Sequence, residues 1–195
     1  MVTIANTKKD IIGDTKKQII NAAKQLFSKY SYLGVSMTDI AKSLNITKAA
    51  LYYHFTGKIE IYKKVLDEVF SGLNKSLAKA LEEKSEIKKL RTFIKNYLDF
   101  GFEEKNFIKA LMFRLPFTDI NIKKYITELK EKNISLADSI IKEIIKKRKL
   151  KKKVDSKLLS FLLIEMMNGL ILEHNWAERK LNSKKITNQI ISALF

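Results

Sequence analysis

Glycine and proline, the two residues that most often interrupt regular structure, are scarce in this chain. Its 195 residues contain six glycines and a single proline, Pro116. Because these residues mark turns and disrupt helix interiors, a chain that has so few of them favours long, uninterrupted helices. Lysine, isoleucine, leucine, glutamate and alanine fill the long segments, which agrees with this interpretation. The sequence therefore predicts an all-α protein.

Apolar residues recur at helical spacing in about nine segments. The first expected helix, 15–30, begins at Thr15, which forms a candidate capping box with Gln18. Ser36 starts a second, short helix, in which Asp39 completes a reciprocal cap. The other expected helices are 48–55, 58–83, 87–102, 107–114, 122–147, 155–179 and 184–195.

Several protein classes are disfavoured by what the sequence lacks. The absence of cysteine excludes disulfides and thiolate sites. There is no glycine-rich phosphate loop, no acid–His–Ser arrangement and no cluster of metal ligands, so we expect neither an enzyme nor a cofactor or metal site. The apolar run 158–172 is broken by Glu165, and the opening MVTIANTKKD lacks the apolar core of a signal peptide. We therefore expect a cytoplasmic protein.

The chain is strongly basic, with a formal net charge of +17. Such a charge favours a polyanionic partner without identifying it. Residues 1–60 carry nine lysines and four acids, so most of the excess lies further along the chain, and a lysine-rich coding bias is an alternative source. The basic run KKRKLKKKVD, 146–155, falls between two expected helices; we interpret it as a solvated loop and helix end, and a nucleic-acid-binding arm is the alternative.

The stretch SMTDIAKSLNITKAALYYHFTGK, 36–58, predicts two short helices joined by a tight turn at Asn45. Leu51 and Phe55 are four residues apart in the second of these helices and face inward. This pattern is typical of a helix-turn-helix, whose second helix enters the major groove of DNA. Thr47 can cap this second helix, which is expected to present Lys48, Ala49, Tyr52 and Tyr53 outward.

Side-chain chemistry suggests how these positions contact DNA. Hydroxyl and imidazole groups can donate hydrogen bonds to phosphate, and tyrosine rings can lie against sugar or a thymine methyl. Lys58 opens the next helix, where a lysine opposes the helix dipole unless a phosphate neutralises both; an ordinary solvated lysine is the alternative. Tyr52 or Tyr53 packed against the first helix is also an alternative. The candidate DNA-binding residues are Thr38, Thr47, Lys48, Ala49, Tyr52, Tyr53, His54 and Lys58.

The stretch from Phe27 to Leu66 resembles the DNA-binding domain of the tetracycline-repressor (TetR) family. The residues that carry the resemblance are Phe27, Gly34, Thr38, Ile40, Ala41, Leu51, Tyr52, Tyr53, His54, Phe55, Lys58, Ile61 and Val65. The sequence departs from the family pattern at Asn45, Ala49, Ala50 and Gly57. Asn45 replaces a glycine in the turn, where asparagine tolerates the left-handed conformation best after glycine.

The resemblance implies a two-part protein: a DNA-binding domain, 1–57, and an effector-binding and dimerisation domain, 58–195, whose first helix, 58–83, links the two. It implies a homodimeric transcriptional regulator, expected to be a repressor, that binds a near-palindromic double-stranded DNA operator and releases it when a small, mostly apolar effector binds. The alternative is an effector-independent architectural or division-control protein of the same fold.

Two segments at the C-terminal end are candidates for the dimer contact. Apolar residues surround almost the whole of the expected helix 155–179, so this helix must be buried on more than one side. A four-helix interface with two-fold symmetry would provide that burial, whereas packing inside one subunit is the alternative. The candidate interface residues are Phe161, Leu162, Gly169, Ile186, Ile190 and Leu194.

Large aromatic and methionine side chains collect in the middle of the chain and in the expected helix 155–179. Such a mixture suits an adaptable apolar pocket, although ordinary core packing is the alternative for each residue. Glu165 either pairs with a base such as Arg114 or faces the effector. The candidate effector-binding residues are Phe93, Tyr97, Phe100, Phe107, Met112, Phe113, Phe117, Glu165, Met166, Asn168 and Trp176.

Overall fold

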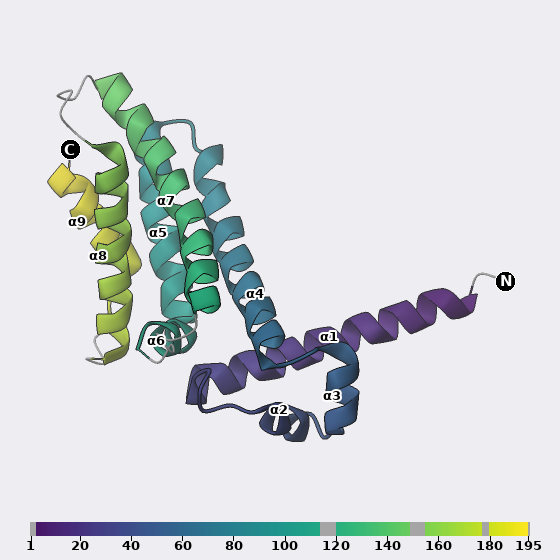
Figure 1. Ribbon diagram of the computed structural model, residues 1–195. Helices are drawn as coiled ribbons and strands as arrows, with labels where there is room; N and C mark the ends of the chain where they lie inside the picture. Colours follow the sequence, from purple (N-terminus) through teal and green to yellow (C-terminus); the bar gives the residue numbers. More distant parts are fainter. Residues whose placement is uncertain (1–2, 114–119, 149–154, 177–179, 195) are drawn as a thin grey trace. The chain divides into compact units, whose positions relative to one another are not determined.

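The computed structural model describes the backbone of residues 3–113, 120–148, 155–176 and 180–194, and the side chains of 14–112, 120–147, 155–174 and 180–193. Every element of this described backbone is helical, which confirms the predicted all-α class (Figure 1). The elements are α1 (Thr3–Tyr30), α2 (Met37–Ser43), α3 (Lys48–His54), α4 (Lys58–Ala78), the 3₁₀ helix η1 (Lys79–Glu82), α5 (Glu86–Glu103), α6 (Lys105–Phe113), α7 (Ile120–Arg148), α8 (Ser156–Trp176) and α9 (Ser183–Leu194).

The helices lie close to the segments expected from the sequence, except at the start of α1. This helix begins at Thr3 and not at Thr15, so the expected capping box is not used. Instead the Gln18 side-chain amide donates to Asp14 Oδ2, one turn earlier, over 3.2 Å. The helix continues through Gly13, since a single internal glycine costs only about 1 kcal/mol relative to alanine. Among the described helices, none combines the length and the apolar character that a bilayer crossing requires.

The chain divides into two compact units. The first comprises Met1–Val69 with Asn106–Asp119, and the second comprises Phe70–Lys105 with Ile120–Phe195. Helix α4 therefore begins in the first unit and ends in the second. The domain boundary expected after residue 57 stays a prediction, because compact packing does not show which segments fold on their own.

Aromatic rings hold the first unit together. The inward stripe of α1 includes Phe27, which is almost completely buried. The ring of Tyr62 on α4 meets the ring of Phe27 edge-on at 5.0 Å, and it also lies 4.7 Å from Tyr32 in the α1–α2 loop and 6.4 Å from Phe107 on α6. Burial raises the pKa of the Tyr62 hydroxyl, so this hydroxyl stays neutral. Tyr62 thus joins four segments of this unit.

Helix α5 is central to the second unit, where it contacts α7, α8 and α9 (Figure 1). Its inward residues Phe93, Ile94 and Leu98 are completely buried. A Cβ added at Gly101 would overlap the side chain of Ile171 on α8, so the missing side chain allows these two helices to approach closely. The unit is therefore organised around one buried helix.

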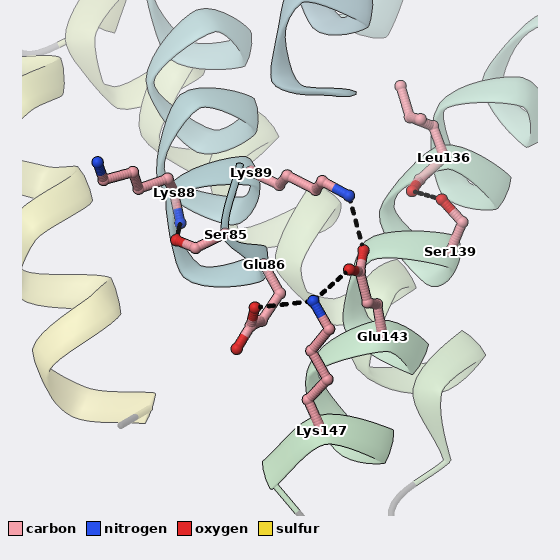
Figure 2. Close-up of polar contacts among 8 residues, drawn as sticks. All are labelled: Ser85, Glu86, Lys88, Lys89, Leu136, Ser139, Glu143 and Lys147. Atoms are coloured by element: carbon pink, nitrogen blue, oxygen red, sulfur yellow. Dashed lines mark hydrogen bonds and ion pairs between the residues drawn. The ribbon is translucent and has the colours of Figure 1, made fainter. Parts of the chain in front are cut away.

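Ionic contacts tie the beginning of α5 to the second half of α7 (Figure 2). The Glu143 carboxylate accepts from Lys89 Nζ and Lys147 Nζ, each at 2.9 Å, and Lys147 Nζ also lies 3.4 Å from Glu86. Hydrogen bonds from Lys147 and then Lys89 lower the pKa of the Glu143 carboxyl to about 2. A network of four alternating charges therefore fixes the register between these helices.

Glu143→Gln is expected to remove an acid-sensitive contribution to the stability of the second unit. The pKa of Glu143 is lower in the folded chain than its ordinary value of 4.5, so its contribution is fully present above that pH and is lost as the pH falls toward 2. Thermal melts at several pH values should show a lower Tm for the variant at pH 7, with the difference from wild type vanishing near pH 2. Glu131→Gln changes an exposed residue of the same helix and should have the Tm of the wild type at every pH. If Glu143→Gln also has the wild-type Tm at every pH, the ionised Glu143 side chain does not stabilise the second unit.

Candidate nucleic-acid interface

The expected cap at the start of α2 is confirmed. The Asp39 backbone N–H donates to Ser36 Oγ at 3.1 Å, and the Ser36 N–H donates to Asp39 Oδ2 at 2.8 Å. The Ser36 hydroxyl and N–H hold the pKa of the Asp39 carboxyl below its ordinary value. Thr38 is exposed on this first turn. The start of α2 is therefore held by its own side chains.

A left-handed residue makes the turn between α2 and α3. Asn45 has φ 54°, as expected for an asparagine that replaces a glycine. Its N–H donates to Lys42 O at 3.1 Å, and the next N–H, of Ile46, donates to Ala41 O at 3.1 Å. Thr47 then caps α3, because its Oγ1 accepts the Ala50 N–H at 3.1 Å. The predicted helix-turn-helix geometry is confirmed.

Helix α3 has one buried side and one exposed side. Leu51 is completely buried and Phe55 is 3% exposed, as the spacing predicted. Lys48 and Ala49 are exposed, Tyr53 is 76% exposed and Tyr52 is 47% exposed. The Lys48 ammonium lies 5.9 Å from the Tyr52 ring. A full turn of lysine, alanine and aromatic side chains is thus available to a partner.

His54, at the end of α3, is half-buried, and its ring meets Tyr53 edge-on at 5.1 Å. Its Nδ1 is buried and has no hydrogen-bond partner among the described residues. Since Nδ1 faces inward, Nε2 is the ring atom that remains for a contact with phosphate.

Lys58 is held inside the first unit. Its ammonium donates to the Tyr32 and Val35 carbonyls, each at 2.8 Å, and lies 4.3 Å above the Tyr32 ring. Partial burial lowers the pKa of this ammonium. We therefore leave Lys58 out of the phosphate contacts proposed below. Sequence reasoning placed a cation at this helix start but did not identify the carbonyls, because they lie 26 and 23 residues earlier in the chain.

Glu60, two residues further on, was also not singled out from the sequence. Its Oε2 accepts the Thr56 N–H at 2.7 Å and the Thr56 hydroxyl at 2.8 Å. Glu60 follows Thr56 by four residues, one more than the Ser/Thr-x-x-Glu spacing of a capping box, so that pattern did not indicate this contact.

The candidate dimer residues on α8 lie on a surface that the single chain leaves uncovered. Phe161 is 46% exposed and Leu162 is 54% exposed, whereas Leu163 and Ile164 point into the second unit. The exposed stripe consists of Leu158, Phe161, Leu162, Met166 and Gly169. On α9, Ile186 and Ile190 are partly exposed, and the Leu194 side chain lies outside the described residues.

The candidate effector residues are divided between the two units. Phe93, Tyr97, Phe100, Glu165 and Asn168 belong to the second unit, and Phe107 and Met112 belong to the first. Met166 is 44% exposed on the outward stripe of α8, so it is associated with the candidate dimer residues. Phe117, Arg114 and the side chains of Phe113 and Trp176 lie outside the described residues, as does most of the basic run 146–155.

A buried polar pair lies among the second-unit residues. The Tyr97 hydroxyl donates to Asn168 Oδ1 at 2.8 Å, joining α5 to α8. Burial, and then the negative charge of Glu165, raise the pKa of the Tyr97 hydroxyl, so it remains a neutral donor.

His174 is a structural residue: its Nδ1 accepts the Leu181 N–H at 3.1 Å and its ring stacks on Phe102 at 4.3 Å.

The helix-turn-helix region matches a known family. Residues 19–65 fit the model of bacterial regulatory proteins of the tetR family. Over 127 residues the chain is 33% identical to the biofilm operon icaADBC HTH-type negative transcriptional regulator IcaR of Staphylococcus epidermidis, an alignment that covers 65% of this chain and 68% of that protein. The chain belongs to the TetR family.

Solved structures of TetR-type regulators share the fold over most of the chain. The regulator FadR from Bacillus subtilis, solved with stearoyl-CoA, matches with a TM-score of 0.78 and 17% identity, covering 91% of this chain and 96% of that one. AibR, solved with isovaleryl coenzyme A and operator DNA, matches with a TM-score of 0.73 and 18% identity over the same shares of the two chains. At these identities the likeness concerns the fold.

Membership of the TetR family makes this protein a transcriptional regulator with a helix-turn-helix DNA-binding domain. The family consists of DNA-binding regulators and not of enzymes.

Proposed function

We propose that this protein is a homodimeric repressor that binds a near-palindromic operator through α3 and releases it when a small, mostly apolar effector binds in the second unit. The observation that carries the proposal is the two-sided character of α3. Leu51 and Phe55 anchor it in the core, while Tyr53 is 76% exposed, so core burial does not explain a tyrosine at this position. An exposed aromatic beside an exposed lysine suits a nucleic-acid surface.

The exposed side chains divide between base and phosphate contacts. Lys48, Ala49 and Tyr53 face the bases, where lysine can donate to guanine and a methyl group can contact thymine. Thr38, Tyr52 and His54 Nε2 donate to phosphates, which set the register without reading sequence. The Thr47 hydroxyl accepts from Ala50 N–H and still has its own proton to donate to a phosphate.

The exposed stripe on α8 supports a two-fold dimer. Leu158, Phe161, Leu162 and Met166 are 44–55% exposed and lie on one side of the helix. A contiguous apolar stripe of this kind marks an interaction surface in a protein of this size. Gly169 continues the stripe, and a Cβ built there meets nothing within 4 Å. A close helix crossing in the dimer would explain a mid-helix glycine that the single chain does not require.

The polar pair of Tyr97 and Asn168 supports a ligand role for the second unit. It places a neutral donor and an amide among buried apolar residues of α5 and α8. Pockets for mostly apolar ligands use a few such groups to orient the ligand. Since FadR and AibR were solved with acyl-CoA compounds, acyl chains are the first effector class to test.

Replacing Tyr53 and His54 together by alanine is expected to weaken operator binding at least roughly 100-fold. Each side chain supplies about 1–3 kcal/mol of contact energy, and every 1.4 kcal/mol or so that is lost weakens binding about tenfold. The probe is a duplex that wild-type protein enriches from a random-sequence library, and binding is measured by fluorescence anisotropy. Tyr30→Ala, which removes another exposed tyrosine of the first unit, should bind as wild type does. Unchanged binding by the double variant would refute the assignment of α3.

Leu162→Glu is expected to convert the dimer to a monomer, because a carboxylate at the centre of an apolar interface cannot be solvated or paired. Light scattering after size-exclusion chromatography measures the change, and operator binding should be lost with the dimer. Leu81→Glu introduces the same charge at another exposed leucine, 52% exposed, and should remain dimeric. A dimeric Leu162→Glu would exclude the α8 stripe as the interface.

An acyl-CoA of the right chain length is expected to raise the Tm of the wild-type protein and release the operator duplex. A ligand at 100 times its Kd adds about 2.7 kcal/mol to the folded state. A series of chain lengths is tested by thermal shift, with free coenzyme A as the control compound. Tyr97→Phe, which keeps the ring and removes the hydroxyl, should reduce the shift, whereas Tyr30→Phe should not. A series without any shift favours the effector-independent alternative.

A further inference from the structure

Lys58 on the first turn of α4 is bound to the segment that leads into α2. Its ammonium contacts the Tyr32 and Val35 carbonyls at 2.8 Å and lies over the Tyr32 ring. Val35 is 2% exposed and directly precedes Ser36, the residue that caps α2. Charge-assisted hydrogen bonds of this length are among the stronger polar contacts in proteins. Lys58 therefore attaches the loop before α2 to the first turn of α4.

Glu60, on the same turn of α4, is bound to the segment that follows α3. Its carboxylate accepts both the backbone N–H and the hydroxyl of Thr56, at 2.7 and 2.8 Å. Phe55, the C-cap residue of α3, directly precedes Thr56 and is buried. These two bonds lower the pKa of the Glu60 carboxyl, the backbone bond first. Glu60 therefore attaches the segment after α3 to the first turn of α4.

The segment between these two attachments is held by its own hydrogen bonds. The Ser36–Asp39 capping box begins it, the Asn45 turn joins its helices, and Thr47 caps the second helix. A segment that is internally bonded and attached at both ends to one helical turn moves with that turn. Neither attachment requires contact with DNA.

We propose that the first turn of α4 positions the recognition helix by holding both ends of the helix-turn-helix, with Lys58 at the start of α2 and Glu60 at the end of α3. Lys58 and Glu60 are positioning residues in this arrangement and touch no phosphate. The proposal deepens the DNA-binding function proposed above and rests on it. It follows that any displacement of this turn of α4 displaces α2 and α3 together.

Two substitutions test the two attachments separately. Lys58→Met and Glu60→Met remove one charged end each while keeping similar side-chain length. Lys64→Met and Glu68→Met make the same charge changes at exposed positions further along α4 and serve as matched controls. Affinity for the enriched duplex is measured at salt concentrations from about 50 to 300 mM, a range in which the salt dependence of binding reports the number of phosphate contacts. The temperature is one at which melts show that each variant is folded.

The expected result for Lys58→Met is a roughly tenfold loss of affinity with an unchanged dependence of log K on log salt. Loss of one phosphate contact in each of the two subunits would instead reduce the magnitude of that slope by about 1.8. For Glu60→Met we also expect a roughly tenfold loss, although removing a negative charge should by itself strengthen binding to DNA. A lowered slope for Lys58→Met, or affinity equal to the control or tighter for Glu60→Met, overturns the proposal.

Amide hydrogen exchange of the free protein provides a second measurement that needs no DNA. Lys58→Met should speed exchange at the Asp39 and Ile40 N–H groups in the first turn of α2, and Glu60→Met should speed exchange at Thr56. Unchanged exchange in both variants overturns the positioning role. If wild-type protein enriches no duplex, the DNA-binding proposal fails, and the exchange rates still decide whether α4 holds the two ends.

Discussion

The burial of Leu51 and Phe55 is the constraint on which the proposed DNA-binding surface depends. These two side chains fix the rotation of α3 about its own axis, because both must face the core of the first unit. Once that rotation is set, Lys48, Ala49 and Tyr53 can only face outward. The exposed side of α3, which we propose as the recognition surface, is therefore a consequence of core packing.

Ring contacts and hydrogen bonds join the other segments of the first unit to that core. Tyr62 brings α1, the α1–α2 loop, α4 and α6 together through ring contacts, and the first turn of α4 attaches to both sides of the helix-turn-helix through Lys58 and Glu60. Apolar contacts set the distance between the segments, whereas the directional hydrogen bonds set their register. Together these contacts attach the helix-turn-helix to α4 on both sides, as the proposed positioning role of Lys58 and Glu60 requires.

The second unit combines the packing of a buried helix with ion pairs on the surface. Helix α5 is buried among α7, α8 and α9, and the surface network of Lys89, Glu143, Lys147 and Glu86 fixes its register against α7 (Figure 2). Helix α8 buries one side against this centre and leaves Phe161 and Leu162 uncovered. The all-round apolar character of α8 in the sequence thus has two explanations in the structure: an inner side that completes the core, and an outer side that supports the proposed dimer contact.

The sequence by itself determined the helical class, most helix limits, the caps at Ser36 and Thr47, the left-handed Asn45 and the inward side of α3. Each of these depends on residues within about one helical turn of one another, so local spacing and propensity suffice. Tertiary structure alone decided that Lys58 binds carbonyls of the α1–α2 loop, that Tyr97 bonds Asn168, and that Met166 faces outward. These depend on segments far apart in the chain, and helical periodicity identifies an apolar side without specifying which partner covers it. The start of α1 was missed for a related reason: a single glycine weakens a helix locally, and whether the helix continues depends on the residues on both sides.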